Sequence, residues 1–285
     1  MVKKNFFISL PYRLRCCGFY FKTITGFHTK EKNLIFKGDN SMNQNHIAAI
    51  ILGAGKGTRM KSDLPKVMMP VAGKPMINHI LDTLKSMQVE KIVTVVSEDG
   101  ALVKEAVAPY QTAVQKEQLG TGHAVKCAQA ELGAFAGTVL VIFGDTPLIT
   151  AHTFLKAVQK VEEGYAVVVL GFTPDDPARY GRLKMKGTEL LEIVEYKDAD
   201  EAERAIRFCN SGCMGFDGRY LFDILSKIGN ENAAHEYYLT DAVAIARHMG
   251  LKCTAIEGNS KEVASANTRE ELALLETFYK ERENW

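Results

Sequence analysis

The chain has 285 residues, 46% of them hydrophobic and 24% charged, which is enough for one large α/β domain or two small ones. Its net charge is +1 and no apolar run approaches the roughly 20 residues that cross a bilayer, so neither nucleic acid nor a membrane is indicated as a partner. The six cysteines form no C-x-x-C pair and have no histidines at zinc-like spacing, which favours free thiols in a reducing compartment.

The first 41 residues differ from the rest in charge, with a net charge of +6 against −5 for the remainder. They show no clear helical or strand period. Three interpretations remain open: a basic targeting segment, a surface-binding arm, or translation of sequence upstream of a true start at Met42. We favour an upstream artefact or a disordered arm over a targeting segment, because Met42 precedes the first predicted strand closely. We expect residues 42–285 to form a single domain, and a chain that starts at Met42 to fold and work like the whole.

An apolar run at 47–52 predicts a buried parallel strand, which leads directly into a glycine-rich loop. The three closely spaced glycines of the loop are Gly53, Gly55 and Gly57. Such glycines let backbone N–H groups turn toward an anion, and Arg59 and Lys66 add positive charge beside them. The spacing differs from that of a dinucleotide fingerprint, which needs a third glycine where Thr58 stands. The stretch therefore predicts a polyphosphate site of another kind.

Strands and helices alternate after this loop. Apolar residues at helical spacing over 76–87 predict an amphipathic helix, and its methionines are core residues. The next expected elements are a strand at 91–97, a short helix at 101–107, a strand from 112, a helix opening at 115–123 and continuing to 132, and strands at 138–143 and 166–172. This alternation predicts a parallel sheet with helices on both faces.

The last third of the chain adds a different pattern. From Tyr180 the sequence alternates like an antiparallel hairpin, with its turn near 186–187. The remaining expected elements are a strand opened by 210–212, a helix at 221–228, a helix at 237–249 starting near Thr240 or Asp241, a strand at 252–257 and a helix at 270–279. The predicted fold is α/β, a Rossmann-like doubly wound, mixed but mostly parallel sheet.

The segment QKEQLGTGH, residues 115–123, has the features of a base-binding loop. Gly120 and Gly122 let the backbone approach a flat ligand closely, and the amide of Gln115 can pair the edge of a pyrimidine. Two glutamines near glycines are weak evidence alone. We interpret His123 as a helix-start residue and not as a catalytic one.

Asp145 follows the apolar strand at 138–143. An aspartate at the carboxyl end of a central strand points into the crevice where doubly wound sheets hold ligands, and its hard oxygens suit Mg²⁺. The alternative is a turn-forming residue before the helix at Thr150. Beside the glycine-rich loop we favour the metal-binding role.

Two motifs resemble a known family. L-x-A-G-x-G-T-R-M followed by L-P-K resembles the signature of the sugar-1-phosphate nucleotidyltransferases, and QKEQLGTGH resembles the uracil-reading loop of the bacterial N-acetylglucosamine-1-phosphate uridylyltransferases. The likeness runs from about 45 to 275. It implies a fold of the nucleotide-diphospho-sugar transferase type and Mg²⁺-dependent transfer of UMP from UTP to N-acetylglucosamine 1-phosphate, giving pyrophosphate and UDP-N-acetylglucosamine. That product is a cytoplasmic precursor of peptidoglycan and lipopolysaccharide.

The resemblance also implies a role for each matching position. The nucleotide would contact Leu52, Gly53, Ala54, Gly55 and Lys66, and its uracil would be read by Gln115, Gly120 and Thr121. The ribose and metal would lie near Phe143, Gly144 and Asp145, and magnesium would bind Asp145 and Asn267. The sugar would contact Gly181, Glu195 and Asn210. From their charge, we expect Arg59 and Lys66 to stabilise the transition state and the leaving pyrophosphate.

The chain also departs from the family pattern. Ala234 and His235 stand where the family tends to have Gln-Gly, and a histidine does not adopt positive φ as freely as glycine. Gly53 replaces a usual alanine, which a loop should tolerate. The family usually continues into a hexapeptide-repeat β-helix that acetylates glucosamine 1-phosphate; the sequence contains none, so we expect no acetyl transfer.

Alternatives to this function remain. The chain could be a nucleotidyltransferase for another sugar 1-phosphate or base, or a catalytically silent nucleotide-binding regulatory module. The presence of Lys66, Asp145 and Asn267 argues against a silent module, because a sensor has no evident need for all three. The expected partners are UTP and a sugar 1-phosphate, with a possible weak homo-oligomer and neither nucleic acid nor a membrane.

Overall fold

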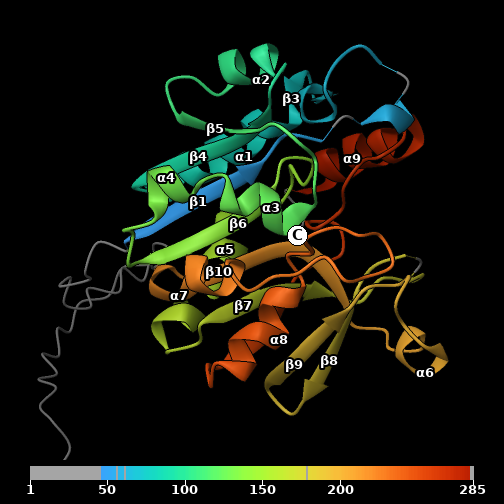
Figure 1. Cartoon of the computed structure of the whole chain (residues 1–285). Helices are drawn as coiled ribbons and strands as arrows, with labels where there is room; N and C mark the ends of the chain where they lie inside the picture. The colour runs from blue at the N-terminus through green and yellow to red at the C-terminus, as the bar shows by residue number, and fades with distance from the viewer. Residues whose placement is uncertain (1–45, 56, 61, 178, 283–285) are drawn as a thin grey trace, which may run out of the picture. The chain divides into compact units, whose positions relative to one another are not determined.

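The computed structural model describes residues 46–282 except 56, 61 and 178 (Figure 1). The expectations for residues 1–41 therefore lie outside the described residues. The strands are β1 (Ile47–Leu52), β2 (Pro70–Val71), β3 (Lys74–Pro75), β4 (Lys91–Ser97), β5 (Gln111–Gln115), β6 (Thr138–Phe143), β7 (Val167–Phe172), β8 (Arg182–Lys186), β9 (Glu189–Val194), β10 (Cys209–Asp217) and β11 (Cys253–Glu257).

The helices are α1 (Met76–Ser86), α2 (Ala101–Ala106), α3 (Thr121–Lys126), α4 (Gln129–Leu132), α5 (Ala151–Glu162), α6 (Glu201–Arg204), α7 (Gly218–Leu225), α8 (Asp241–His248) and α9 (Arg269–Glu281). Two short 3₁₀ helices, Thr58–Met60 and Lys66–Met68, follow β1.

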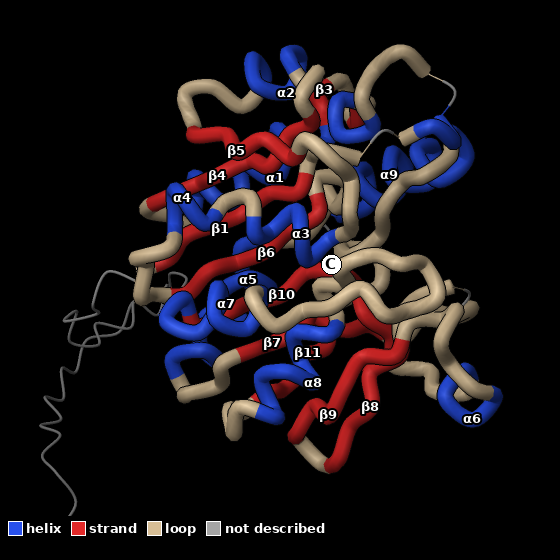
Figure 2. Tube along the Cα trace, viewed as in Figure 1, coloured by secondary structure: helices blue, strands red, loops and turns tan. Residues whose placement is uncertain are grey.

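One nine-stranded sheet forms the centre of the fold, with the strand order β11-β7-β10-β6-β1-β4-β5 and the hairpin β8–β9 joined to β10. The strands from β6 to β5 run parallel, as does β11 with β7. β10 is antiparallel to both of its neighbours, β6 and β7. The sheet is therefore mixed and mostly parallel, which confirms the predicted fold class. Figure 2 shows the hairpin extending away from the sheet at the β7 side.

Alternate residues of β1 point to opposite faces of the sheet, and each face has its own core. Ala48 and Ile50 belong to a cluster that includes α3, α4, α7 and α8. Ile47, Ala49 and Ile51 belong to a second cluster that includes α1, α2 and α5. Both faces of the central strands are thus covered by helices, as the near-continuous apolar runs of these strands require.

A third, smaller core lies under α9. Its buried members are Met60, Met69, Val71, Met76, Leu148, Ala266 and Leu275. The backbone N–H of Ala72, in the turn between β2 and β3, donates to the carboxylate of Glu276 on α9 at 2.6 Å. Figure 1 shows α9 beside β3, although the two are far apart in sequence. The end of the described chain is in this way packed against the segment that follows the glycine-rich loop.

The predicted local structure needs correction at three places. The helix expected up to 132 is divided into α3 and α4, because bonds such as Ala128 N–H to Val125 C=O tighten the turn between them. The helix expected at 237–249 starts at Asp241 after the N-cap Thr240, which confirms the predicted start, but residues 237–239 are not helical because the backbone groups of Tyr237 are bonded to another loop, described below. The 210–212 segment lies inside β10, which begins at Cys209 and is irregular between Asn210 and Met214.

Within the described part of the chain, no helix has the length and apolar character needed to cross a membrane.

Candidate active site

The carboxyl ends of three parallel strands bring the predicted nucleotide residues to one edge of the sheet. β1 ends at Leu52, β6 at Phe143 and β5 at Gln115. Leu52 is paired directly with Phe143, and the Gly144 N–H donates to the Leu52 carbonyl at 2.9 Å. In doubly wound sheets this edge is where ligands bind.

The loop after β1 is shaped by close backbone contacts. The Gly53 N–H donates to the Val95 carbonyl at 2.8 Å, which continues the β1–β4 pairing by one residue. Gly57 has φ of +61°, and a Cβ there would lie 2.5 Å from the Cβ of Lys66. Only glycine allows this approach, so the loop is folded directly onto Lys66. Ala54 is buried, whereas Gly55 has open space where a side chain would be.

Four predicted residues meet in one polar cluster beside this loop, and they come from three segments. The Lys66 ammonium forms an ion pair with the Asp145 carboxylate and donates to Asn267 Oδ1 at 2.6 Å. The Arg59 guanidinium donates to the same Asn267 oxygen at 2.9 Å. Asp145 is only 8% exposed, so these charges interact where water screens them less than at an open surface. We call Arg59, Lys66, Asp145 and Asn267 the phosphate cluster.

The phosphate cluster fits a divalent cation of the hard type. A carboxylate oxygen of Asp145 and an amide oxygen of Asn267 converge on one cation, the Lys66 ammonium, and oxygens of these two kinds are what Mg²⁺ prefers. Among the described residues no group of three or more His, Cys, Asp or Glu side chains could hold a metal ion. A metal at the cluster would thus take much of its coordination from water and phosphate oxygens, as Mg²⁺ commonly does.

The start of α9 fixes Asn267, and sequence reasoning did not identify the residue responsible. Thr268 is the N-cap of α9 and accepts from the Glu271 N–H at 3.2 Å, while the Glu271 carboxylate accepts from the Asn267 N–H. Arg269 donates to the Met60 carbonyl at 3.3 Å. The T-x-x-E pattern at 268–271 is a capping-box signal that could have indicated Glu271.

Gln115 lies at the base of the predicted uracil loop and is only 3% exposed. Its amide nitrogen donates to the Gly120 carbonyl at 3.2 Å and lies 3.1 Å from His123 Nδ1. Both bonds use the amide nitrogen, which leaves the amide oxygen as an acceptor. His123 stands in the first turn of α3 and supports Gln115, in agreement with its interpretation as a helix-start residue.

Two backbone hydrogen bonds hold the predicted uracil loop against the segment before α8. The Tyr237 N–H donates to the Leu119 carbonyl at 2.8 Å, and the Gly122 N–H donates to the Tyr237 carbonyl at 2.7 Å. Gly120 has φ of +116°, and a Cβ there would lie 2.6 Å from the Tyr237 oxygen. Glycine is thus required at 120 both for its backbone conformation and for the close approach of Tyr237.

The three predicted sugar residues also come together. The Asn210 N–H donates to the Gly181 carbonyl at 2.8 Å, and a Cβ at Gly181 would lie 3.4 Å from Glu195 Oε1. Burial raises the pKa of the Glu195 carboxyl; a hydrogen bond from Thr240 Oγ1, at 3.1 Å, acts in the opposite direction, and the Asp198 charge adds to the rise. This group combines a glycine backbone, a side-chain amide and a carboxylate, which suits a polyhydroxyl ligand.

Two contacts join the nucleotide and sugar sides. Gly212 has φ of +90°, and a Cβ there would lie 2.7 Å from the Phe143 ring, so the irregular part of β10 packs on the end of β6. The Leu239 N–H donates to Thr121 Oγ1 at 3.0 Å, one residue before Thr240 reaches Glu195. The segment before α8 therefore contacts both sides of the site.

His235 has the positive φ expected of a glycine, +54°, in the loop before this segment. The Asn232 side chain closes the loop: its oxygen accepts from the Ala234 and Glu236 N–H groups, both at 3.2 Å, and its nitrogen donates to the Glu236 carbonyl at 2.6 Å. The chain thus has a histidine where the family tends to have a glycine, but the backbone keeps the conformation that glycine favours. This conformation has a steric cost for the histidine.

A mixed doubly wound sheet with a glycine-rich anion loop and a cationic cluster at its carboxyl edge is the architecture of an α/β nucleotidyltransferase. The chain belongs to the MobA-like NTP transferase domain family, whose model matches residues 49–207. Nucleotidyltransferases of this kind generally need a divalent metal ion and act on nucleoside triphosphates and sugar phosphates.

Two similar proteins identify closer relatives within this class of nucleotidyltransferases. The chain is 48% identical over 243 residues to the bifunctional protein GlmU of Paramagnetospirillum magneticum, covering 85% of this chain and 54% of that protein. It is 50% identical over 237 residues to the bifunctional protein GlmU of Rhodospirillum rubrum, covering 82% and 53%. The chain thus spans about half the length of these relatives.

A solved structure agrees in fold. A Bacillus anthracis protein assigned as a glucose-1-phosphate thymidylyltransferase, crystallised with a sucrose, matches with a TM-score of 0.65 at 19% identity. The match covers 81% of this chain and 94% of that chain.

Proposed function

We propose that this chain transfers UMP from UTP to N-acetylglucosamine 1-phosphate, giving UDP-N-acetylglucosamine and pyrophosphate. The observation that carries the proposal is the phosphate cluster, in which two cationic side chains meet Asp145 and Asn267 beside an anion-binding loop. The similarity to bifunctional GlmU proteins supports the choice of nucleotide and sugar.

The reaction joins two highly charged molecules, so it depends on positioning and charge neutralisation. A phosphate monoester with a second pKa of about 6 is largely dianionic at neutral pH, so its oxygen needs no general base. This oxygen attacks the α-phosphorus of UTP, the bond to the bridging oxygen breaks, and pyrophosphate leaves. In the proposal, Arg59 and Lys66 hold the phosphates and stabilise the charge that builds up on them.

We further propose that the divalent ion is Mg²⁺, held by Asp145 and Asn267. It would supply positive charge against the phosphate oxygens of the bound nucleotide. Lys66 now occupies the space between these two oxygens, so its ammonium would turn toward the phosphates when the cation binds. Glu271 would keep Asn267 in place, because it holds the Asn267 N–H from the first turn of α9.

Base and sugar would be recognised by the two groups described above. The amide oxygen of Gln115 and the backbone at Gly120 and Thr121 would pair with uracil. Glu195 and Asn210 would bind the ring hydroxyls and the acetamido group. We place the reaction in the cytoplasm, because the four cysteines that the structure describes are free thiols, which suits a reducing compartment.

The proposal is tested by pyrophosphate release with four nucleoside triphosphates and a panel of sugar 1-phosphates. We expect UTP with N-acetylglucosamine 1-phosphate to be the best pair. Glucosamine 1-phosphate and glucose 1-phosphate should have a lower kcat/KM, by roughly 10² to 10⁵, because they leave polar groups of the site unpaired. Equal turnover of glucose 1-phosphate would overturn the proposed acceptor, and no release with any pair would overturn the transferase function.

A further inference from the structure

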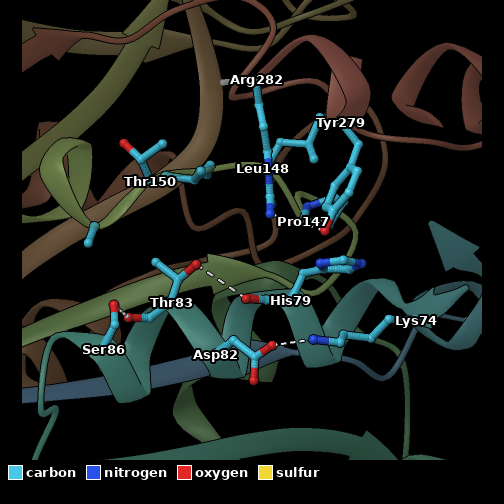
Figure 3. A pocket seen from close by; sticks show the side chains of 12 residues that line it. Lys74, His79, Asp82, Thr83, Ser86, Pro147, Leu148, Thr150, Tyr279 and Arg282 are labelled. Carbon is cyan, nitrogen blue, oxygen red and sulfur yellow. Dashed lines mark hydrogen bonds and ion pairs between the residues drawn. The ribbon is translucent and has the colours of Figure 1, made fainter. Parts of the chain in front are cut away.

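A cavity of about 490 Å³ lies away from the phosphate cluster, between α1, the loop from β6 to α5 and the last turn of α9 (Figure 3). This volume is within the range of small-molecule sites. None of the residues that line the cavity belongs to the predicted active site. The cavity is nevertheless close to it in the chain, since Pro147 lines it and stands two residues after Asp145.

Positive charge lines the cavity from two sides, with Lys74 just before α1 and Arg282 at the end of α9. Lys74 and Arg282 line it together with a single carboxylate, Asp82, which forms an ion pair with Lys74. The Arg282 guanidinium lies 3.8 Å from the centre of the Tyr279 ring and donates to the Tyr279 hydroxyl at 3.0 Å. Figure 3 shows Arg282 and Tyr279 reaching from α9 toward α1. The lining of the cavity thus has two cations for one anion, so it favours an anionic ligand.

His79 forms the floor near these charges and is only 6% exposed. Burial lowers the pKa of its imidazole, and the hydrogen bond to the Val71 backbone opposes this; the charges of Lys74 and Arg282 lower the pKa further and that of Asp82 raises it, with a net lowering. The ring is therefore neutral at physiological pH. Its Nε2 lies 2.8 Å from the Val71 carbonyl, which can only accept, so Nε2 carries the proton and Nδ1 is an acceptor.

Hydroxyl groups also line the cavity, from Thr83 and Ser86 on α1 and from Thr150 just before α5. Thr83 donates to the His79 carbonyl at 3.2 Å, Ser86 donates to the Thr83 carbonyl at 2.7 Å, and Thr150 donates to Glu262 at 3.3 Å. Each hydroxyl proton is thus used within the protein. The Thr83 and Ser86 oxygens keep their lone pairs for a ligand, whereas the Thr150 oxygen also accepts from the Thr153 N–H and keeps one. Acceptors of this kind match the hydroxyl protons of a sugar.

We propose that this cavity is a binding site for a small sugar phosphate. The phosphate would bind to Lys74 and Arg282, and the sugar hydroxyls would donate to Thr83, Ser86 and Thr150. Arginine and lysine are the side chains that bind phosphate most strongly, through charge-assisted hydrogen bonds. The site is separate from the proposed reaction and does not depend on it.

Calorimetric titration with glucose 6-phosphate tests the proposal, with inorganic phosphate and glucose as partial ligands. We expect glucose 6-phosphate to bind more tightly than phosphate, and glucose to give no measurable heat. The double variant Lys74→Gln/Arg282→Gln should weaken the binding of glucose 6-phosphate by about tenfold or more. The matched control is Lys85→Gln, an exposed lysine of α1 that does not line the cavity, and it should leave the affinity unchanged.

A second variant separates this site from the phosphate cluster. Lys66→Gln should leave the affinity for glucose 6-phosphate unchanged, because Lys66 does not line the cavity. NMR titration of His79 gives an independent readout: a bound dianion near Lys74 and Arg282 should raise the imidazole pKa, and the double variant should lose this rise. Binding that survives in the double variant, or that is lost in Lys66→Gln, would overturn the proposal.

Discussion

The nucleotide side and the acceptor side of the candidate site are held together in different ways. On the nucleotide side, backbone hydrogen bonds and glycines fix the loops; at Gly57 and Gly120 an added Cβ would lie 2.5 to 2.6 Å from the neighbouring atom. On the proposed acceptor side, most of the candidate groups are side chains, and the Glu195 carboxylate is oriented by the hydroxyl of Thr240. The nucleotide side should therefore tolerate few changes of shape, whereas the acceptor side can be altered one functional group at a time.

In the proposed function both substrates meet at the phosphate cluster, so a change there should give the largest effect. We expect Asp145→Asn to lower kcat by on the order of 10²-fold or more, because it removes a charged metal ligand with almost no change in shape. Asp175→Asn, at an exposed loop position, is the matched control and should be neutral. Near-normal turnover of Asp145→Asn at ordinary metal concentration would exclude Asp145 as a metal ligand.

Glu195→Gln tests the acceptor side. We expect KM for the sugar phosphate to rise by about tenfold, because a charged acceptor of a hydrogen bond becomes neutral. A KM equal to that of the unaltered chain would remove Glu195 from the acceptor site.

The same variant should change the dependence of stability on pH. The pKa of the folded Glu195 is raised, so between the unfolded and folded pKa values the folded state binds more protons. Stability therefore falls as pH rises through this window, and the cost is complete once the pH is above the folded pKa. Glu195→Gln should remove it, which makes the variant slightly more stable near pH 7 in thermal unfolding. A lower melting temperature would contradict this.

The smallest effect concerns the loop before Tyr237. His235→Gly should raise the free energy of unfolding by about 0.5 to 1 kcal/mol, since the relief of positive-φ strain exceeds the added entropy of the unfolded chain. Unfolding in denaturant measures this change in the free energy of unfolding. Ala234→Gly is the control, because the φ of Ala234 is not positive and that variant should gain nothing. A destabilised His235→Gly would mean that the imidazole itself supports the loop.

The two sides also differ in how much of each could be predicted from the amino-acid sequence. The strand at 47–52 and the strand at 138–143 were predicted with their observed bounds, because a buried parallel strand is a continuous apolar run between turn residues. The glycine-rich loop was found from its spacing. The start of α8 near Thr240 or Asp241 was predicted as well, but residues 237–239 were wrongly included in the helix, because the backbone of Tyr237 is bonded to Leu119, a contact between distant segments that no local pattern records.

The prediction of the acceptor-side residues depended most on the resemblance to a known family. Gly181 lies directly before β8, Glu195 directly after β9 and Asn210 in the irregular part of β10, and they share no spacing that would mark them as one group. Glu271 was missed although its capping signal is present, because a cap by itself does not indicate that the residue before it is a candidate metal ligand. Folding brings these residues together through strand order, which the sequence pattern predicts only in outline.

The separation of the two sides is tested most directly by measuring KM for both substrates in two variants, Gln115→Ala and Glu195→Gln. Gln115→Ala should raise KM for UTP by roughly 10- to 100-fold and leave KM for the sugar phosphate nearly unchanged, because it removes hydrogen bonds to the base alone. Glu195→Gln should show the reverse pattern. If KM for both substrates rose together in each variant, the site would act as a single unit, and the account of a separate nucleotide side and acceptor side would be wrong.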